Sequence, residues 1–402
     1  MTTKPGKNIL MVAYSEYLSD ARIRRAAETL ALRGHHLVLI SLKDGMHPAS
    51  AIVNDVVVQR VPFARYRGGS AFLYMCSYFM FVAYVFFLVA WKSLKQRPDA
   101  VYVHTMPDFV VLVSLIPRLL GSRIIIDFHD MMPELYMDKF RISENHVITR
   151  FLKLQERVCA SLAHAVICVH EPHKSVLIAR DVRKEKISVV LNVPDPSLFG
   201  FEMKRWMPVE QLHVVYHGTI VKRLGLDIAV NAFADVVPVI PNSKFFIFGR
   251  GDYLDHLEAL VETKHLQSSV QLSRDFFSVE QVPRMLAHAA MGLIANRRTP
   301  ATEFMLPVKL MEYVYLGIPV IAPRLKTISY YFPDNSLMYY EPENCKALAG
   351  AIVSLWHDED RRHRMTERAQ EILKGFEWAT VQQNLLIAID LVNAKEKHNV
   401  GS

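Results

Sequence analysis

Two stretches in the second half of the chain carry side chains that could hold a diphosphate and a ribose. In the first, Tyr216-His217-Gly218-Thr219 closes an apolar run and is followed by Lys222 and Arg223. Where a strand turns into a helix, free backbone N–H groups and the positive helix end favour a phosphate. The two cations would add side-chain charge at that point. Turns of this kind are common, so this turn alone does not establish a phosphate site.

The second stretch is Leu306-Pro307-Val308-Lys309-Leu310-Met311-Glu312-Tyr313, which ends in a turn at Gly317. Proline suits the first turn of a helix, and residues three apart share a helix face. Lys309 could therefore meet phosphate oxygens while Glu312, one turn later, accepts both hydroxyls of a ribose. The alternative is an ordinary Lys–Glu pair on the surface.

In the first half, Asp127-Phe128-His129-Asp130 follows an apolar run, and Glu134 comes soon after. A histidine beyond the carboxyl end of a parallel strand lies where such sheets bind ligands. Neighbouring carboxylates could tune its proton affinity. A purely structural loop histidine is the alternative.

Other candidates for chemistry are weaker. Asp358-Glu359-Asp360 begins an arginine-rich, solvated helix, and His170 and His173 fit a helix start better than a metal site. Gly249-Arg250-Gly251 lacks the third glycine of a dinucleotide fingerprint, which counts against an NAD enzyme. We expect no metal and no bound cofactor.

Length and composition exclude several classes of protein. The chain has 402 residues, of which 51% are apolar and 22% charged, so two or three domains with large cores are expected rather than disorder. Its four cysteines, Cys76, Cys159, Cys168 and Cys345, show no metal-ligand or disulfide pattern and fit reduced thiols. The amino terminus has no signal-peptide core, so a cytoplasmic protein is expected.

The positive charge is concentrated in the first half. Residues 1–200 hold 25 Lys and Arg against 17 Asp and Glu, whereas residues 201–402 hold 22 against 23. An anionic partner is therefore expected for the first half. An anionic membrane surface, nucleic acid and a phosphorylated substrate are the candidates. Nucleic acid is disfavoured because the basic residues are spread out and the aromatic residues near them fit a lipid surface.

A stretch of 22 residues without a charge, Ser70–Trp91, is rich in Phe and Tyr. It is long enough to cross a bilayer, but neighbouring strands on both sides and flanking Lys and Arg favour a helix lying in the headgroup region. A buried core helix and a membrane span remain alternatives.

The rest of the chain alternates short apolar runs with helical patterns, which predicts parallel sheets covered by helices. Strands are expected at 8–14, 36–41, 56–61, 100–104, 124–127, 165–169, 187–191, 214–217, 245–248, 270–272, 291–295, 320–322 and 336–340. The prolines of Asn192-Val193-Pro194-Asp195-Pro196 indicate a linker. The sequence thus predicts two tandem Rossmann-like, doubly wound α/β domains, 1–200 and 201–378, facing a central cleft. A C-terminal helix within 379–402 is expected to cross back to the first domain.

Taken together, these motifs resemble the retaining, GT-B-fold glycosyltransferases of family 4, in particular bacterial members that act in polysaccharide assembly. The resemblance covers nearly the whole chain and rests on residues 127–134, 192–195, 218–227, 248–252, 306–320 and 376–378.

The resemblance implies a nucleotide-diphosphate sugar as co-substrate, bound without a metal. Arg223 and Lys309 fall on the family's two basic positions, Gly218 and Thr219 would donate amides to the diphosphate, and Glu312 falls on the ribose-binding carboxylate. Cations and amides would neutralise the departing diphosphate.

Two positions depart from the family pattern. Phe304 occupies the position of the carboxylate that usually holds the donor sugar, so either Glu303 or backbone amides of the loop Glu303, Phe304, Met305 and Leu306 would take this role. Leu224 replaces the usual lysine before the glycine of the phosphate turn.

The same resemblance assigns His129, Asp130 and Glu134 to catalysis at the acceptor or donor hydroxyls. The expected reaction moves a hexose from a UDP- or GDP-sugar to a lipid-linked saccharide or polyprenyl-type acceptor on the inner face of the cell membrane. Without an evident protein nucleophile, retention would come from displacement on the same face. A UDP-sugar epimerase and a non-catalytic nucleotide-sugar-binding scaffold are the alternatives.

Overall fold

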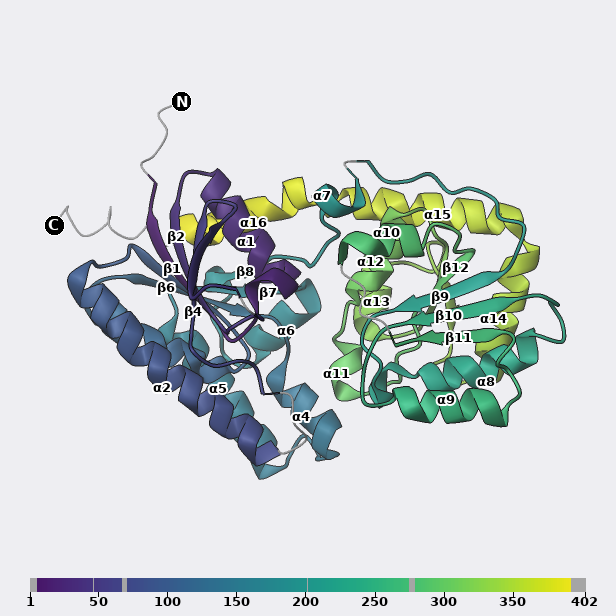
Figure 1. The fold of residues 1–402 in the computed structure, drawn as a ribbon, viewed down its shortest axis with the longest axis horizontal. Helices are drawn as coiled ribbons and strands as arrows, with labels where there is room; N and C mark the ends of the chain where they lie inside the picture. Colours follow the sequence, from purple (N-terminus) through teal and green to yellow (C-terminus); the bar gives the residue numbers. More distant parts are fainter. Residues whose placement is uncertain (1–5, 46, 67–70, 201, 275–278, 392–402) are drawn as a thin grey trace. The chain divides into compact units, whose positions relative to one another are not determined.

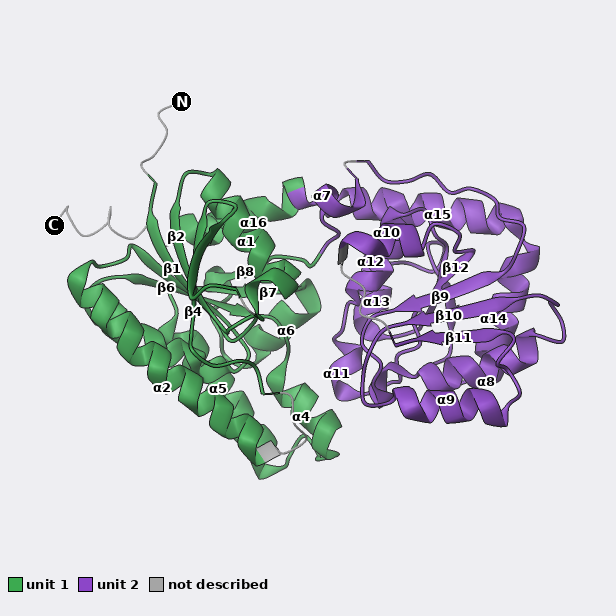
Figure 2. Ribbon diagram, viewed as in Figure 1, with its two compact units in different colours: residues 1–192, 379–402 green, residues 193–378 purple. Residues whose placement is uncertain are grey.

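The computed structural model describes residues 6–45, 47–66, 71–200, 202–274 and 279–391. The chain divides into two units (Figure 2): unit 1 comprises Met1–Asn192 with Ala379–Ser402, and unit 2 comprises Val193–Trp378. The first boundary therefore lies between residues 192 and 193, inside the proline-containing linker, rather than at the expected residue 200.

Unit 1 is built on an eight-stranded sheet with the order β3-β4-β2-β1-β5-β6-β7-β8. All neighbouring strands are parallel except β3, which pairs with β4 in the antiparallel sense. The strands are β1 (Asn8–Ala13), β2 (His36–Ser41), β3 (Ser50–Val53), β4 (Val56–Arg60), β5 (Ala100–His104), β6 (Arg123–Phe128), β7 (Ala165–Cys168) and β8 (Ile187–Val189). The sequence predicted every strand of this sheet except β3, a short edge strand without buried residues.

The helical segments of unit 1 cover this sheet (Figure 1). They are η1 (Tyr17–Ser19), α1 (Ala21–Leu32), α2 (Ala71–Lys95), η2 (Asp108–Ser114), α3 (Leu115–Leu119), α4 (Met132–Phe140), α5 (Val147–Leu162), α6 (Glu171–Ala179), η3 (Lys184–Lys186) and α16 (Trp378–Leu391). The C-terminal helix α16 is tied to this unit because Asn384 Nδ2 donates to the Val189 carbonyl at 2.9 Å and Lys7 Nζ donates to the Ile389 carbonyl at 2.9 Å.

Unit 2 contains a six-stranded, all-parallel sheet with the order β11-β10-β9-β12-β13-β14. Its strands are β9 (His213–His217), β10 (Lys244–Phe248), β11 (Val270–Ser273), β12 (Met291–Leu293), β13 (Val320–Pro323) and β14 (Met338–Tyr340). Its helical segments are α7 (Pro196–Phe199), η4 (Lys222–Leu224), α8 (Leu226–Val236), α9 (Leu254–Thr263), η5 (Val279–Gln281), α10 (Val282–Met285), α11 (Pro300–Glu303), α12 (Val308–Tyr315), α13 (Lys326–Tyr331), α14 (Cys345–His357) and α15 (Glu359–Lys374).

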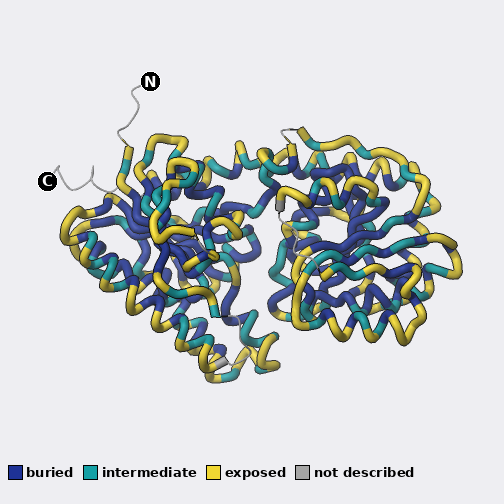
Figure 3. Tube along the Cα trace, viewed as in Figure 1, coloured by how far each residue is buried: buried dark blue, intermediate teal, exposed yellow. Residues whose placement is uncertain are grey.

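Both sheets follow the doubly wound pattern that the sequence predicted. The strand order reverses between β1 and β5 in unit 1 and between β9 and β12 in unit 2. Every residue of β5 and of β13 is buried, and Figure 3 shows buried backbone in the interior of each unit. Strands covered on both faces are typical of parallel sheets. In such sheets ligands bind beyond the carboxyl ends of the strands near the reversal, which directs attention to the ends of β5, β6 and β9.

Helix α2 covers unit 1 with one stripe and exposes another. Its buried stripe is Tyr78, Phe81, Val82, Val85 and Val89. Its exposed stripe consists of Phe72, Leu73, Phe79, Met80, Tyr84, Phe87, Trp91 and Leu94. The alternative of a fully buried core helix is therefore wrong. Within the described ranges, this is the one helix long and apolar enough to span a membrane.

A second exposed apolar stripe lies on α5 and was not predicted from the sequence. Val147, Phe151, Leu154 and Val158 are all exposed, at a spacing that places them on one face of the helix. Both α2 and α5 pack against η2. Unit 1 therefore presents two apolar stripes on helices that share a neighbour.

Candidate active site

The turn that leaves β9 brings Gly218 next to Lys309. Gly218 has a φ of +115°, and a Cβ there would lie 3.0 Å from Lys309 Nζ. Its N–H donates to the Phe248 carbonyl at 2.9 Å, so this amide already holds the turn against β10. The Thr219 N–H has no hydrogen-bond partner among the described residues. Of the two amides expected to bind phosphate, the one on Thr219 is open.

Lys309 and Arg223, both predicted to bind the diphosphate, lie near the carboxyl end of β9: Lys309 packs over Tyr216, and Arg223 belongs to η4 in the turn that follows. Lys309 Nζ lies 3.7 Å from the centroid of the Tyr216 ring. Burial raises the pKa of Tyr216, and the charge of Arg223 opposes this shift. Within the described part of the chain, neither cation forms an ion pair, and Arg223 Nε is buried without a hydrogen-bond partner. Unit 2 thus places two basic side chains without an ion-pair partner among the described residues near the end of β9.

The environment of Lys309 disfavours its own charge. Burial lowers the pKa of Lys309 from 10.5 to about 7, and the nearby Glu312 carboxylate opposes this shift only in part. The ammonium form of Lys309 is poorly stabilised in the free protein because it is shielded from water. An anionic ligand would therefore stabilise this charged form strongly.

Arg297 holds the turn that carries Arg223. Its backbone N–H donates to the Arg223 carbonyl at 3.0 Å, and its Nε donates to the Lys222 carbonyl at 3.2 Å. Its guanidinium also pairs with Asp227 at the start of α8. Arg297, which the sequence did not single out, is therefore a positioning residue for the turn.

Glu312, predicted to bind ribose, is oriented by a histidine from β9. Its Oε2 lies 2.7 Å from His217 Nε2, and His217 Nδ1 lies 3.1 Å from the Tyr313 hydroxyl. Only 8% of His217 and 9% of Glu312 is exposed. Because a carboxylate only accepts hydrogen bonds, Nε2 of His217 donates to Glu312. The Tyr313 hydroxyl, which contacts Nδ1, also donates to the Val215 carbonyl at 3.4 Å.

The same network depends on a glycine in β12. A Cβ on Gly292 would lie 2.3 Å from the Tyr313 ring. The Tyr313 hydroxyl in turn accepts the His217 backbone N–H at 3.2 Å. The tyrosine therefore fixes both the backbone and the ring of His217, and His217 fixes Glu312.

In the loop expected to hold the donor sugar, most hydrogen-bonding groups already have partners within the protein. Glu303 Oε1 accepts from Arg298 Nε at 3.0 Å, and its Oε2 accepts from the Lys326 N–H at 2.7 Å. The N–H groups of Glu303, Phe304 and Met305 donate to carbonyls of the same turn. Among the described residues, the Leu306 N–H has no partner. Leu306 is therefore the one open donor of this loop.

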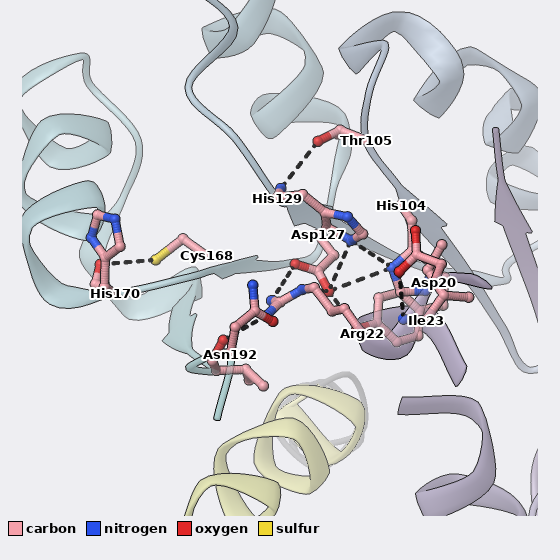
Figure 4. A network of polar contacts seen from close by, with 12 residues as sticks. Asp20, Arg22, Ile23, His104, Thr105, Asp127, His129, Cys168, His170 and Asn192 are labelled. Carbon is pink, nitrogen blue, oxygen red and sulfur yellow. Dashed lines mark hydrogen bonds and ion pairs between the residues drawn. The ribbon is translucent and has the colours of Figure 1, made fainter. Parts of the chain in front are cut away.

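In unit 1, the sequence motif at the end of β6 is organised around Asp127 (Figure 4). Arg22 from α1 binds it with two hydrogen bonds, from Nη2 to Oδ1 at 2.7 Å and from Nε to Oδ2 at 3.2 Å. Tyr102 from β5 donates to Oδ2 at 2.8 Å. Burial disfavours the Asp127 charge, but Arg22 and the neighbouring histidines hold its pKa well below the usual range.

His129, predicted to be catalytic, lies at the edge of this network. Its Nε2 lies 3.0 Å from His104 Nδ1, and its backbone N–H donates to Thr105 Oγ1 at 3.3 Å. Burial lowers the pKa of His104, so a neutral His104 fixes one nitrogen of the partly exposed His129. Among the described residues, the other nitrogen of His129, Nδ1, has no hydrogen-bond partner.

His104, Asp127 and His129 also place their ligand atoms within 4.8 Å of one another, as a metal site would. The carboxylate in this group already accepts from Arg22 and Tyr102. Its negative charge is therefore balanced by a protein cation, and these contacts account for the cluster.

The other two predicted catalytic residues have different surroundings. Glu134 is buried and pairs with Arg180, which also binds Glu156 at 2.9 Å. Asp130 is exposed. Glu134 thus serves a buried ion cluster that joins α4, α5 and α6.

Two rejected metal candidates have the predicted structural roles. His170 caps α6, where its Nδ1 accepts from the His173 N–H at 3.0 Å. Asp358 caps α15 by accepting from the Arg361 N–H at 2.9 Å. Both interpretations as helix starts are confirmed.

Sequence reasoning missed Arg22, His104 and His217. Each contacts a partner far away in the chain, 105 residues in the case of Arg22 and Asp127. The available signal was position: His104 and His217 are the last residues of β5 and β9, where parallel sheets bind ligands.

Two family models match the chain. Residues 19–192 match the family model "Glycosyl transferase 4-like domain", and residues 204–372 match "Glycosyl transferases group 1". The two matches meet at the boundary between the units and together cover most of the chain.

Curated relatives are distant. The chain is 23% identical to the amylovoran biosynthesis glycosyltransferase AmsK of Erwinia amylovora, over 54% of this chain and 53% of the relative. It is 20% identical to a phosphatidylinositol N-acetylglucosaminyltransferase protein of Arabidopsis thaliana, over 74% of this chain and 64% of that protein. The chain thus spans between half and two thirds of the length of these relatives.

Solved structures resemble the fold over nearly its full length. Sucrose-phosphate synthase from Thermosynechococcus elongatus has a TM-score of 0.74 at 16% identity, covering 96% of this chain and 100% of that one. HepE from Anabaena, solved in complex with UDP, has a TM-score of 0.69 at 16% identity, covering 95% of this chain and 99% of that one. The chain belongs to the group 1 glycosyltransferases of family 4, with the GT-B fold of two Rossmann-like domains.

Proposed function

We propose that the protein transfers a hexose, with retention of configuration, from a UDP- or GDP-sugar to a lipid-linked saccharide or polyprenyl-type acceptor. The observation that carries the donor half is that two basic residues near the end of β9, Arg223 and Lys309, have no ion-pair partner among the described residues. These charges and the open Thr219 amide suit a diphosphate, and Glu312 suits the ribose hydroxyls.

For the chemical step, the bond between the anomeric carbon and the diphosphate oxygen breaks as the acceptor oxygen attacks from the same face. The acceptor hydroxyl's proton passes to the departing diphosphate oxygen, so the products are the glycoside and a nucleoside diphosphate. Arg223, Lys309 and Thr219 neutralise the leaving group, and no metal is part of the proposal. The free nitrogen of His129 binds a substrate hydroxyl, oriented by His104 and Thr105.

The acceptor half rests on unit 1. The exposed apolar stripe of α2 is flanked by Arg65 on one side and by Lys92, Lys95 and Arg97 on the other. Aromatic side chains with basic neighbours suit a helix lying in the headgroup region of an anionic bilayer. We propose that the enzyme works as a peripheral protein on the inner face of the cell membrane, where it would meet a lipid-linked acceptor.

Two of the relatives support this class of substrate. AmsK is named for the biosynthesis of amylovoran, and the Arabidopsis relative is named as a phosphatidylinositol N-acetylglucosaminyltransferase. HepE was solved with UDP.

A thermal-shift panel tests the donor. Nucleoside diphosphates and their sugars should raise the melting temperature, because a ligand that binds the folded state stabilises it in proportion to its affinity. The variant Glu312→Gln should lose most of this shift for nucleotides while its ligand-free melting temperature stays close to wild type. Equal shifts in the wild type and in this variant would contradict the assigned ribose site.

An acceptor test separates the remaining alternatives. Incubation with labelled donor and lipid extract should give a labelled lipid only when both are present. An epimerase would instead scramble the sugar without lipid. A scaffold would bind donor tightly but release no nucleoside diphosphate with any lipid acceptor.

A further inference from the structure

Unit 1 contains a cavity of about 600 Å³ at the end of its sheet opposite His129 and Asp127. Its walls include Asn8, His36 and Val57 near the amino ends of β1, β2 and β4, together with the last turns of α1 and α2. The candidate active site lies at the carboxyl ends of the strands. This cavity is therefore separate from the His129 network.

The cavity is lined by more positive than negative charge. Lys92, Lys95 and Arg97 contribute three cations, whereas Asp55 is the one carboxylate among its described lining residues. Arg97 donates to the Leu120 carbonyl at 3.3 Å. Within the described residues, Lys92 and Lys95 form no ion pair; Lys95 Nζ only lies over the Trp91 ring, at 3.9 Å. The cavity is thus suited to an anion.

The cavity is also continuous with apolar surface. Its floor includes the buried Ile9 and Leu37. Trp91 both lines it and belongs to the exposed stripe of α2, next to Leu94 and one turn after Phe87. A ligand that places a negative group on the lysines can therefore lay apolar chains along α2.

We propose that this cavity, defined by Ala31, His36, Trp91, Lys92, Lys95 and Arg97, binds the phosphate headgroup of an anionic membrane lipid. Its volume falls within the range of ordinary ligand sites, and tryptophan suits the boundary between headgroups and acyl chains. The lipid would hold the carboxyl end of α2 at the membrane surface. The site differs from general attraction to a charged bilayer because it takes one lipid at one place.

The helix dipole also favours lysines at the carboxyl end of a helix, so Lys92 and Lys95 would be stable at these positions without any ligand. The test must therefore distinguish the cavity from charge alone. The charge-reversed variant Lys92→Glu/Lys95→Glu removes the cations, whereas Ala31→Phe fills the cavity without changing charge. Arg183→Glu/Lys184→Glu makes the same charge change at exposed positions of unit 1 and serves as the control.

The probe is dihexanoyl phosphatidylglycerol below its micelle concentration, titrated by calorimetry and by tryptophan fluorescence. We expect saturable binding with one lipid per chain, weakened at least tenfold in Lys92→Glu/Lys95→Glu and in Ala31→Phe, and changed less than twofold in the control. Trp91→Phe should abolish the fluorescence change but retain calorimetric binding. Melting curves establish that each variant is folded.

Three outcomes would overturn the proposal. Equal binding by the cavity variants and the control would place the lipid elsewhere, and weakening by charge reversal but not by Ala31→Phe would reduce the effect to surface attraction. Inorganic phosphate or glycerol phosphate binding as tightly as the lipid would identify a free phosphate as the ligand. The titration needs no sugar donor, so its result is independent of the proposed transfer reaction.

Discussion

Charged side chains are paired at one of the two strand ends that carry the candidate chemistry and unpaired at the other. At the end of β6, Asp127 is matched by Arg22 and supported by Tyr102, so the buried charges are balanced within the protein. At the end of β9, Lys309 and Arg223 have no ion-pair partner within the described residues. The first arrangement belongs to the fold, and we propose that the second is completed by a ligand.

This contrast separates residues that position from residues that bind. Removing one member of a balanced, buried pair leaves an uncompensated charge and destabilises the fold. Removing a buried cation that has no ion-pair partner should not destabilise the ligand-free protein. It should weaken only the complex with the sugar donor. Substitutions at the end of β6 should therefore reduce mainly stability, whereas substitutions at the end of β9 should reduce mainly turnover.

The largest expected effect is on stability in unit 1. Arg22→Met leaves Asp127 buried without its cation, which should reduce the free energy of unfolding by about 3–5 kcal/mol. Urea denaturation measures this change. Arg24→Met, two residues away on the same helix, removes a partly exposed pair with Glu28 and should cost about 0–1 kcal/mol. Similar losses in both variants would contradict the comparison.

In unit 2, the expected loss is in catalysis. Lys309→Met should lower kcat/KM for transfer by roughly 10²–10³-fold, the usual effect of removing one group that stabilises a developing charge. Its melting temperature should equal or exceed that of the wild type, because a poorly solvated cation is removed. Lys346→Met, on the surface, serves as the control. Wild-type turnover by Lys309→Met would refute the diphosphate site.

A smaller effect is expected for the residue that orients Glu312. His217→Ala should raise the KM for the sugar donor about tenfold, corresponding to one hydrogen bond of about 1.4 kcal/mol, with a smaller change in kcat. His217→Gln, whose amide can still donate to Glu312, should recover part of this loss. A pure loss of folded protein would instead lower the apparent kcat of both variants with KM unchanged.

The smallest effect is a dependence of donor affinity on pH. The pKa of Lys309 is lowered to about 7, so the ammonium that meets the diphosphate is lost from the free protein as the pH rises above 7. The Kd for the nucleoside diphosphate should therefore increase about threefold between pH 6.5 and pH 7.5. Lys309→Arg keeps its charge over this range, and calorimetry should show a flatter profile. A Kd independent of pH in the wild type would rule out this role of the lysine.

The fold was more predictable than the contacts. Strands and helices follow from local periodicity, so β2 and β5 lie where the sequence placed them. The sequence did not predict the edge strand β3, because none of its residues is buried and the alternation between exposed and half-buried positions is weak. Its pairing with β4, rather than its own composition, makes it a strand.

The candidate site was predictable only where a single motif carries the chemistry. Lys309 and Glu312 lie one turn apart on α12, so their spacing was visible in the sequence. His217 and Arg22 act through partners 95 and 105 residues away, and a buried arginine on an amphipathic helix looks like a surface residue. Glu303, one residue before the family position, was considered for the donor sugar. Its contacts with the Arg298 side chain and the Lys326 N–H come from outside its own helix and could not be inferred from the motif.

The path of the chain also determines the order in which the protein can be completed during synthesis. Unit 2 is one continuous segment, Val193–Trp378, inserted between the two parts of unit 1. Asn384 in α16 binds the carbonyl of Val189 across 195 residues. A ribosome therefore delivers the whole of unit 2 before it delivers the helix that finishes unit 1. Unit 2 can therefore finish folding before unit 1 does. Until α16 is synthesised, the Val189 carbonyl in β8 lacks its hydrogen bond from Asn384.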